Sequence, residues 1–389
     1  MSDMIISAAE IAQRLEQNPP TPEQEAIIQA PLEPALVIAG AGSGKTETMA
    51  NRVVWLVANG KVSVNEILGM TFTRKAAGEL GERIRGHIAK LVKEGLAPVE
   101  MDELDQATVT TYNSFANRIY SQYAVLIGRD PDATVLGEAA AWQLARSIVK
   151  ESTGEVLSDL DKSLDTLTDA VLRLSRAIAD NVANPEDIVA FARSLDEHTV
   201  NMPVDGPGSR KTAAVDAWVK AREVGTTLPV LVDLAMEFAA AKRRQGLIEY
   251  SDQVALALEI CQRFSSVVDD FRSQFKVVLL DEYQDTSVVQ TQLLSLLFAQ
   301  TPVMAVGDPH QSIYGWRGAS ADNIEQFGAA FGAGIDQTRT YSLSTSWRNP
   351  VDVLAAANVL VRPLTAKTQV LIQRVAHKRF TRFTVASLI

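Results

Sequence analysis

Short, continuous apolar runs alternate with helix-length segments in the first third of the chain, and the same alternation returns in the last third. Runs that are apolar at every position are typical of parallel strands buried on both faces of a sheet. Five strands are predicted, at Ala35 to Ile38, Ile67 to Thr73, Ala107 to Tyr112, Val277 to Leu280 and Pro302 to Val306. The pattern therefore predicts an α/β fold built on a parallel sheet.

The middle of the chain, from about Asn117 to Gly246, has a different pattern. Apolar residues recur there at helical spacing, and clear strand runs are missing. An example is the set Ala141, Leu144, Ala145 and Ile148. We interpret this region as a helical insertion into the α/β domain, with a loop at Pro203 to Gly208.

Composition and charge narrow the class of protein. Of the 389 residues, 47% are hydrophobic and 22% are charged, which excludes collagen-like, wholly disordered and disulfide-scaffold chains. The net charge of −10 argues against binding nucleic acid through bulk positive charge, so a polyanion must be met by a local patch. The single Cys, the scattered His residues and the lack of an apolar run of roughly 18 residues predict a cytoplasmic protein without a membrane span.

A small-residue loop follows the first predicted strand and precedes a helical stretch. It reads Ala39-Gly40-Ala41-Gly42-Ser43-Gly44-Lys45-Thr46. Its backbone N–H groups could wrap phosphates at a helix N-terminus, Lys45 could reach the β- and γ-phosphates, and the Thr46 hydroxyl could ligate Mg²⁺. The alternative is a glycine-rich turn with an incidental lysine, but the order of strand, loop and helix favours a nucleotide site.

Two adjacent carboxylates end the strand predicted at Val277 to Leu280. Asp281 would bind Mg²⁺ directly or through water, and Glu282 could orient and deprotonate an attacking water. Such a pair is costly without a neutralising cation, although a solvated turn is the alternative interpretation. Together with the loop, these residues predict hydrolysis of a nucleoside triphosphate.

With these motifs the sequence resembles the superfamily 1 DNA helicases of the UvrD/Rep type, from about Pro20 to Pro350, with seven motifs in the family's order. The resemblance implies a RecA-like domain that couples ATP hydrolysis to three-prime to five-prime movement on single-stranded DNA. It divides the chain into a first RecA-like part (1–116), a helical subdomain (117–246), a second RecA-like part (247–341) and a stub of a second motor domain (342–389). The wording from Gly44 to Gly60 looks closest to actinobacterial helicase-nuclease motors of the AdnAB-like kind.

The resemblance implies an adenine-reading role for Gln24. The same residues also fit a helix capping box, with Thr21 as N-cap, Pro22 in the first turn and Gln24 at the third position, and both roles are compatible. Glu47 stands where many family members have an arginine over the base. Adenine affinity is therefore expected to depend more on Gln24 and Trp347.

Three further residues acquire nucleotide roles from the resemblance. Gln311 would sense the γ-phosphate. Trp347 would stack on adenine, and Arg348 would stabilise charge on the γ-phosphate in the transition state.

The DNA-contact motifs lie after three predicted strands. Phe72 would engage a base while hydroxyl groups meet phosphate, although Phe72 alone would more often be a core residue. In the second motif Asn113 replaces the usual His, and in the third an aromatic residue beside an arginine would form a stacking platform. The predicted DNA-binding residues are Thr71, Phe72, Thr73, Thr111, Asn113, Trp316 and Arg317.

The end of the chain does not match a second motor domain. Only 41 residues follow Arg348, whereas a RecA-like domain needs on the order of 100. From Val353 to Ile389 there are six basic residues and no acidic ones, so this tail cannot supply carboxylates to a nuclease metal site, and a solvated end is the alternative to a DNA contact. We expect a fragment, a truncated product or a frameshifted one.

Three function hypotheses remain at this stage. The first is an ATPase that binds ATP and Mg²⁺ weakly, hydrolyses slowly and unwinds negligibly without a missing segment or a partner, such as a second motor or nuclease subunit. The second is a catalytically inactive module that binds single-stranded DNA, a duplex junction or a protein. The third is a small-molecule P-loop kinase, against which the motifs around Phe72 and Trp316 argue.

Overall fold

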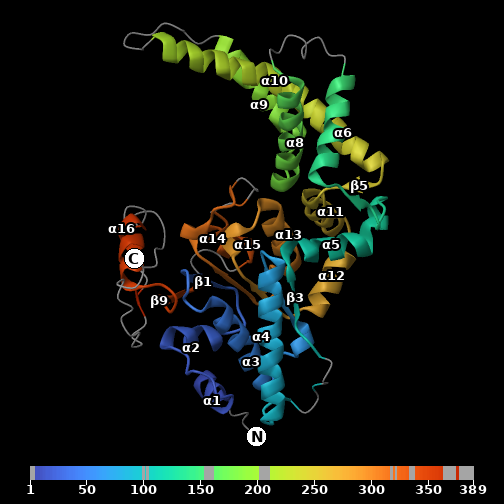
Figure 1. The fold of residues 1–389 in the computed structure, drawn as a ribbon. Helices are drawn as coiled ribbons and strands as arrows, with labels where there is room; N and C mark the ends of the chain where they lie inside the picture. Colours follow the sequence, from blue (N-terminus) through green and yellow to red (C-terminus); the bar gives the residue numbers. More distant parts are fainter. Residues whose placement is uncertain are drawn as a thin grey trace, which may run out of the picture.

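A parallel sheet lies at the centre of the α/β part of the molecule (Figure 1). The computed structural model describes residues 5–98, 101, 105–152, 162–200, 211–315, 319, 322–332, 338–361 and 374–375. The sheet has six strands in the order β3-β2-β6-β7-β1-β8, and every neighbouring pair is parallel. The strands are β1 (Ala35–Ala39), β2 (Ile67–Thr71), β3 (Thr108–Thr111), β6 (Val277–Leu280), β7 (Val303–Gly307) and β8 (Arg339–Leu343).

The five strands predicted from apolar runs are confirmed, and β8 was missed. In β1, β2, β6 and β7 every residue is buried, which is why the runs are apolar throughout. Strand β8 is an edge strand in which only Leu343 is fully buried, while Arg339, Thr340 and Ser342 are exposed. An edge strand with polar residues lacks the signal on which the prediction relied.

Helices cover both faces of the sheet, because successive strand residues point to opposite sides. Val37 and Leu279 face a layer that includes α1 to α4, whereas Leu36 and Leu280 face a layer that includes α5 and α11 to α15. The first layer comprises α1 (Ala8–Arg14), α2 (Pro22–Ile28), α3 (Lys45–Ala58) and α4 (Arg74–Lys93). The second comprises α5 (Tyr112–Tyr123), α11 (Tyr250–Arg263), α12 (Ser265–Gln274), α13 (Val288–Phe298), α14 (Asp322–Glu325) and α15 (Phe327–Ala330).

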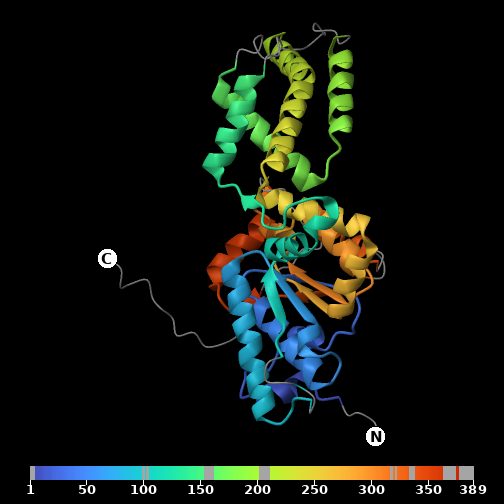
Figure 2. The ribbon, with the colours of Figure 1, turned by 90° about the vertical axis from the view of Figure 1, so that its right-hand side faces the viewer.

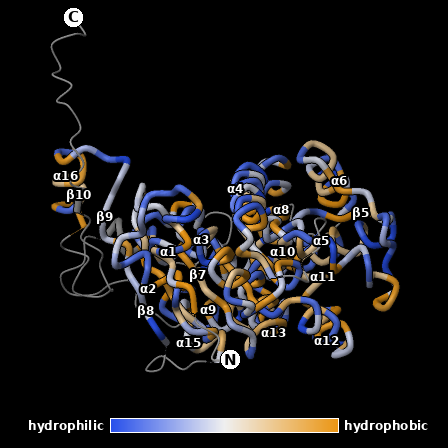
Figure 3. The backbone as a smooth tube through the Cα atoms, turned by 90° about the horizontal axis from the view of Figure 1, so that it is seen from below, coloured by the Kyte–Doolittle hydropathy of each residue, from blue (hydrophilic) through white to orange (hydrophobic). Residues whose placement is uncertain are grey.

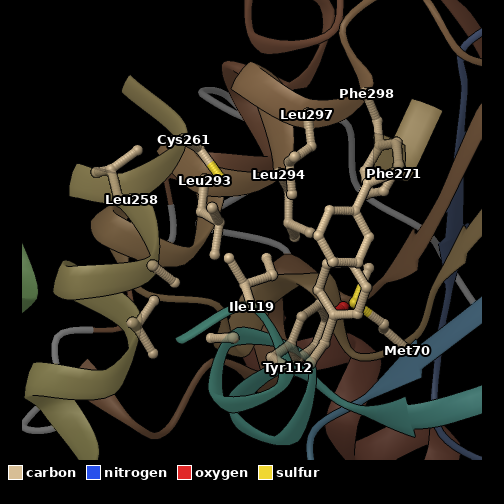
Figure 4. Close-up of a cluster of buried hydrophobic side chains, with 14 of the residues drawn as sticks. Met70, Tyr112, Ile119, Leu258, Cys261, Phe271, Leu293, Leu294, Leu297 and Phe298 are labelled. Carbon is tan, nitrogen blue, oxygen red and sulfur yellow. The ribbon is translucent and has the colours of Figure 1, made fainter. Parts of the chain in front are cut away.

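The two layers bury different amounts of each helix. Figure 4 shows the second layer, in which Ile119, Phe271 and Leu294 meet beneath the sheet together with the buried thiol of Cys261. In the first layer α4 buries one stripe at helical spacing, including Leu80, and is otherwise mostly hydrophilic (Figure 3). The polar face of α4 is therefore available to solvent and ligands.

The predicted helical region forms a cluster beyond one end of the sheet (Figures 1 and 2). Its core includes Val171 and Phe238. The helices are α6 (Glu138–Glu151), α8 (Leu164–Asn181), α9 (Pro185–Val200) and α10 (Lys211–Arg244), and the short strands β4 (Thr134–Val135) and β5 (Leu247–Ile248) pair at its base. A division at residues 116 and 117 falls inside α5, whose Phe115 and Ile119 belong to the sheet core. The loop predicted at 203–208 lies outside the described residues.

Helix α10 contains a segment of membrane-spanning length, whereas the sequence pattern predicted none. From Val215 to Arg244 it is long and apolar enough, by length and composition, to cross a membrane. Its apolar half is interrupted by Asp233 and Glu237, which is why no continuous run was visible in the sequence. One third of its most apolar stretch is buried inside the molecule, where it contributes to the core of the helical cluster, so it is weak evidence for a span.

The chain continues past β8 along the strand ends. It forms the short strand β9 (Thr345–Ser346) and helix α16 (Val351–Val361), and β9 pairs with β10 (Arg374–Val375). In Figure 1 this segment lies at the side of the sheet next to β1.

Candidate functional site

The loops that follow the six strands converge at one edge of the sheet. Parallel strands all end on the same side, and ligands of open α/β sheets bind at this edge. The described parts of the motifs that follow these six strands therefore lie at or near one surface.

The loop after β1 has the geometry of a phosphate cradle. Gly42 and Gly44 have φ angles of 75° and 87°, which only glycine adopts readily, and α3 begins at Lys45. The Ser43 hydroxyl donates to the Gly40 carbonyl (2.8 Å) and closes the turn. A cavity of about 280 Å³ opens above it, lined by residues 41–47, Arg83, Glu282, Gln311 and Arg348.

Lys45 and Glu282 meet across this cavity. The Lys45 Nζ donates to Glu282 Oε2 at 2.8 Å, and Gln284 Nε2 donates to the same oxygen at 2.8 Å. Burial raises the pKa of Glu282, but the charge of Lys45 and these hydrogen bonds outweigh it, so the pKa lies below its usual value. The ionised form of Glu282 is thus favoured, and its carboxylate is paired with Lys45.

Asp281 is buried and fixed through its backbone. Its N–H donates to the Met70 carbonyl (2.8 Å), and the Tyr112 hydroxyl donates to its carbonyl (2.8 Å). Burial, and then the charge of Glu282, raise the pKa of Asp281 to about 6. A divalent cation would lower the cost of this ionised pair; Thr46 and Glu282 line the phosphate cavity, whereas Asp281 is not among its lining residues. Within the described residues no group of three or more His, Cys, Asp or Glu could hold a metal by itself.

A larger cavity of about 860 Å³ adjoins the phosphate cradle. It is lined by Glu16, Gln17, Asn18, Pro19, Pro20, Gln24, Gly42, Gly44, Glu47, Asn51, Trp347 and Arg348. The predicted capping box is present, since Gln24 Oε1 accepts from the Thr21 N–H at 2.9 Å. The other atom of the Gln24 amide, Nε2, lies 3.0 Å from the place where a Cβ on Gly44 would be. Gln24 therefore caps α2 and also reaches the phosphate loop.

The segment that carries Trp347 and Arg348 is fastened to the phosphate loop. The Trp347 N–H donates to the Gly42 carbonyl (2.8 Å), while the Asn349 amide and the Ser346 hydroxyl donate to the Ala41 carbonyl at 3.0 and 3.1 Å. A Cβ on Gly42 would lie 2.6 Å from the Cβ of Arg348. Both predicted nucleotide residues of this segment therefore line the cavities.

Gln284 is a site residue that the sequence analysis missed. Its Oε1 accepts from the Asp308 N–H (3.0 Å), and the Asp308 carboxylate accepts from Gln311 Nε2 (2.6 Å). Because Gln284 also bonds Glu282, it links the loops after β6 and β7. These hydrogen bonds connect Gln311, the predicted γ-phosphate sensor, to Glu282, the predicted general base.

Arg83 was also missed. It lines the phosphate cavity from α4 and forms an ion pair with Glu47, while His87 Nε2 lies 3.9 Å from the other Glu47 oxygen. Burial lowers the pKa of His87 more than the Glu47 charge raises it. Arg83 lies on α4, beyond the motif that contains Phe72, and a single basic residue on a helix does not by itself indicate a phosphate site.

Phe72 pairs with an aromatic residue from a distant motif. Its ring stacks on Tyr314 with centroids 4.7 Å apart and an interplanar angle of 27°. Both lie near the strand ends, and Phe72 is only half-buried, so the alternative of a core phenylalanine does not apply. Tyr314 was not predicted, because Trp316 was the expected stacking residue of this motif. Trp316 and Arg317 lie outside the described residues.

The other predicted DNA residues that the structure describes differ in exposure and in their hydrogen bonds. Thr71 is fully buried and its hydroxyl has no partner among the described residues, so it lies beneath the surface that DNA would touch. Thr73 caps α4 by accepting from the Ala76 N–H, and Thr111 caps α5 by accepting from the Ser114 N–H, both at 3.1 Å. The exposed Asn113 accepts from Gln290 at 2.8 Å. Thr73 and Asn113 remain at the surface.

The fold and the site together define the class of protein to which the chain belongs. A parallel sheet with a phosphate-binding loop after β1 and paired carboxylates after β6 is a RecA-like P-loop domain. Residues 20–332 match the family model described as the UvrD/REP helicase N-terminal domain, and the chain belongs to this family.

Named relatives agree with this assignment. The chain is 27% identical over 340 residues to DNA helicase II of Haemophilus influenzae and 27% identical over 340 residues to the ATP-dependent DNA helicase PcrA of Leuconostoc citreum. It is 28% identical over 352 residues to the ATP-dependent DNA helicase UvrD1 of Mycobacterium leprae. These alignments cover 87% of this chain but only 40%, 38% and 39% of the relatives, so the chain spans about two fifths of their length.

Proposed function

We propose that this chain is the ATP-binding and ATP-hydrolysing half of a UvrD-like helicase that moves three-prime to five-prime on single-stranded DNA in repair or recombination. The observation that carries the proposal is the pair of adjoining cavities around one phosphate loop. They share Gly42, Gly44, Glu47 and Arg348, so a base, a ribose and a triphosphate can lie along one continuous trough. The helices from α6 to α10 are the proposed inserted subdomain.

In this proposal each side chain of the trough has one task. Gln24 and Trp347 contact adenine, and residues 39–46 wrap the phosphates. Lys45 leaves Glu282 for the β- and γ-phosphates, which frees the Glu282 carboxylate to activate water. Thr46 and Asp281 would hold Mg²⁺, which would supply charge neutralisation. Gln311 and Arg348 face the γ-phosphate from the cavity wall.

Single-stranded DNA is the proposed partner of the surface beside the trough. The stacked rings of Phe72 and Tyr314 offer an aromatic platform, and Arg74 and Lys75 follow directly on the exposed start of α4. Unwinding at a duplex junction is proposed to need a second RecA-like half, supplied by a longer chain or by a partner such as a second motor or nuclease subunit. The cytoplasm is the compartment that such a role implies. The closer resemblance to AdnAB-like motors stays a prediction.

Steady-state ATP hydrolysis by residues 1–389, with and without single-stranded DNA, tests the proposal. We expect slow turnover that Lys45→Ala and Glu282→Gln both reduce by at least tenfold. Glu282→Gln should keep ATP binding, because it leaves the phosphate loop intact, whereas Lys45→Ala should weaken it. Turnover that neither substitution lowers would contradict the enzyme proposal.

A second candidate is a catalytically inactive module that binds DNA or a protein. The ion pair between Lys45 and Glu282 favours it, because this contact occupies both groups. In that case the protein would bind single-stranded DNA with equal affinity with and without ATP, and Phe72→Ala would weaken the binding in both conditions.

A further inference from the structure

The first turn of α2 contacts the chain just beyond β8. Pairing of β8 with β1 ends at Leu343, so the next residue, Ser344, has left the sheet. There the Ser344 N–H donates to Glu23 Oε2 at 2.8 Å, and the Ser344 hydroxyl donates to Glu23 Oε1. Both oxygens of one carboxylate are thus used by a single residue 321 positions away.

This contact joins two walls of the base cavity. Glu23 is the neighbour of Gln24 on α2, and Ser344 precedes the segment that places Trp347 in the cavity. Helix α2 is in turn fixed to α3, because the buried Arg52 donates to the carbonyls of Ile27, Ile28, Ala30 and Pro31 at 2.9 to 3.2 Å. Glu23 therefore links helix α2, which is fixed to α3, to the segment of Trp347 that would cover a bound base.

We propose that Glu23 is a positioning residue for base recognition, which holds Trp347 and Gln24 at a fixed separation so that the cavity accepts an adenine ring. This inference rests on the proposed nucleotide site. A hydrogen bond to an ionised acceptor is stronger than a neutral one, and a cavity that is ordered before binding loses less entropy when its ligand enters. The phosphate loop and α3 are built from contacts that do not involve Glu23, although Arg348, on the segment that Glu23 holds, also lines the phosphate cavity.

The test compares a ligand with a base and one without it. We would measure dissociation constants of residues 1–389 for MgATP and for magnesium tripolyphosphate by calorimetry. Glu23→Gln should weaken MgATP binding about tenfold and tripolyphosphate binding clearly less, because the phosphate loop itself keeps its contacts. Glu25→Gln is the matched control, since it removes the same charge from the same turn of α2. Among the described residues, the side chain that donates to the Glu25 carboxylate is that of Gln29.

Two additional measurements separate positioning from general damage. Hydrogen exchange of residues 343–349 should be faster in Glu23→Gln and unchanged in Glu25→Gln, because only the first replaces one of the two oxygens that accept from Ser344 with an NH2 group and removes the charge of the acceptor. Ser344→Ala keeps that amide and loses the hydroxyl bond, so it should weaken MgATP about threefold. It also provides a test if Glu23→Gln does not fold.

The outcomes discriminate between the two proposals. Equal MgATP affinity in the Glu23 and Glu25 variants would overturn the positioning role, as would a parallel loss of MgATP and tripolyphosphate binding in Glu23→Gln. If Ser344→Ala has the affinity of the wild type and Glu23→Gln is unfolded, the positioning role is also rejected. A wild-type chain that binds neither ligand would reject the nucleotide site itself.

Discussion

Glu282 has a backbone conformation that few residues adopt. Its φ angle of 49° lies in the left-handed region, which costs a side-chain-bearing residue about 1 to 3 kcal/mol and persists only where the surroundings enforce it. Lys45 and Gln284 bond its carboxylate, and the Asp285 N–H donates to its carbonyl at 2.9 Å. The strain places the carboxylate over the phosphate loop, which is where the proposed reaction needs it.

The first testable prediction at the scale of single residues concerns Gly42. An alanine there would adopt a φ of 75° and its Cβ would collide with Arg348 at 2.6 Å. Gly60 also has a positive φ, but a Cβ there would meet nothing within 4 Å. We expect Gly60→Ala to cost about 1 kcal/mol of unfolding free energy and Gly42→Ala about 1 to 3 kcal/mol more.

Gly42→Ala should also weaken MgATP binding, because relief of the clash moves the segment of Trp347 away from the loop. Urea denaturation and calorimetric titration of both variants measure the two effects. The interpretation fails if the two alanine variants have the same stability and the same affinity.

At the scale of elements, the helical cluster is tied to the sheet domain by an ionic network with a buried centre. Arg176 of α8 donates to the exposed Glu138 of α6 (2.9 Å) and to Glu249 (2.8 Å), which precedes α11. Lys242, at the end of α10, donates to Glu249 and Asp252 at 2.9 and 2.7 Å and is only 4% exposed. Four helices therefore meet at these charged groups, and the buried pair of Lys242 and Glu249 must stay paired because both groups have left water.

Asp180 on α8 carries a cost in this network. Burial, and then the charge of Asp252, raise the pKa of Asp180 to about 6, above the value near 4 of an unfolded chain. Between these pH values the folded state binds more protons than the unfolded state, so the stability contributed by this group falls as the pH rises. The cost is fully present above about pH 6 and absent below about pH 4.

Asp180→Asn should therefore stabilise the protein at pH 7.5 and have little effect at pH 4.5. Allowing for solvent screening of a partly exposed group, we expect on the order of 1 to 2 kcal/mol. Thermal melting of both proteins across this range measures the difference. Asp233→Asn on the exposed side of α10 is the control, and a Asp180→Asn effect that does not change with pH would contradict the assignment.

The same scale shows what the sequence could predict. Buried strands such as β6 are apolar at every position, and residues 39–46 combine small residues with Lys45 and Thr46 in a characteristic order, so both were predictable. Strand β8, Tyr314 and the contact of Glu23 with Ser344 depend on the neighbours that the fold supplies. Glu23 is an ordinary first-turn acid in the sequence, and its partner is known only once β8 takes its place beside β1.

At the scale of the whole molecule, the charge limits how DNA can bind. A net charge of −10 repels a polyanion, so affinity must come from stacking and from a few local cations. Arg74 and Lys75 are exposed next to Phe72, whereas Lys90 and Lys93 lie in the last turn of the same helix, roughly 25 Å away by helix geometry and beyond the screening length.

The salt dependence of single-stranded DNA binding should therefore be shallow and local. Each phosphate contact contributes about −0.7 to the slope of log K against log salt, so two contacts contribute about −1.4. Arg74→Ala with Lys75→Ala should make the slope less negative by about this amount, while Lys90→Ala with Lys93→Ala should leave it unchanged. Fluorescence anisotropy between 50 and 300 mM salt, about the range in which counterion release is resolved, gives both slopes. A double variant at Arg74 and Lys75 with the wild-type slope would place the phosphate contacts elsewhere on the molecule.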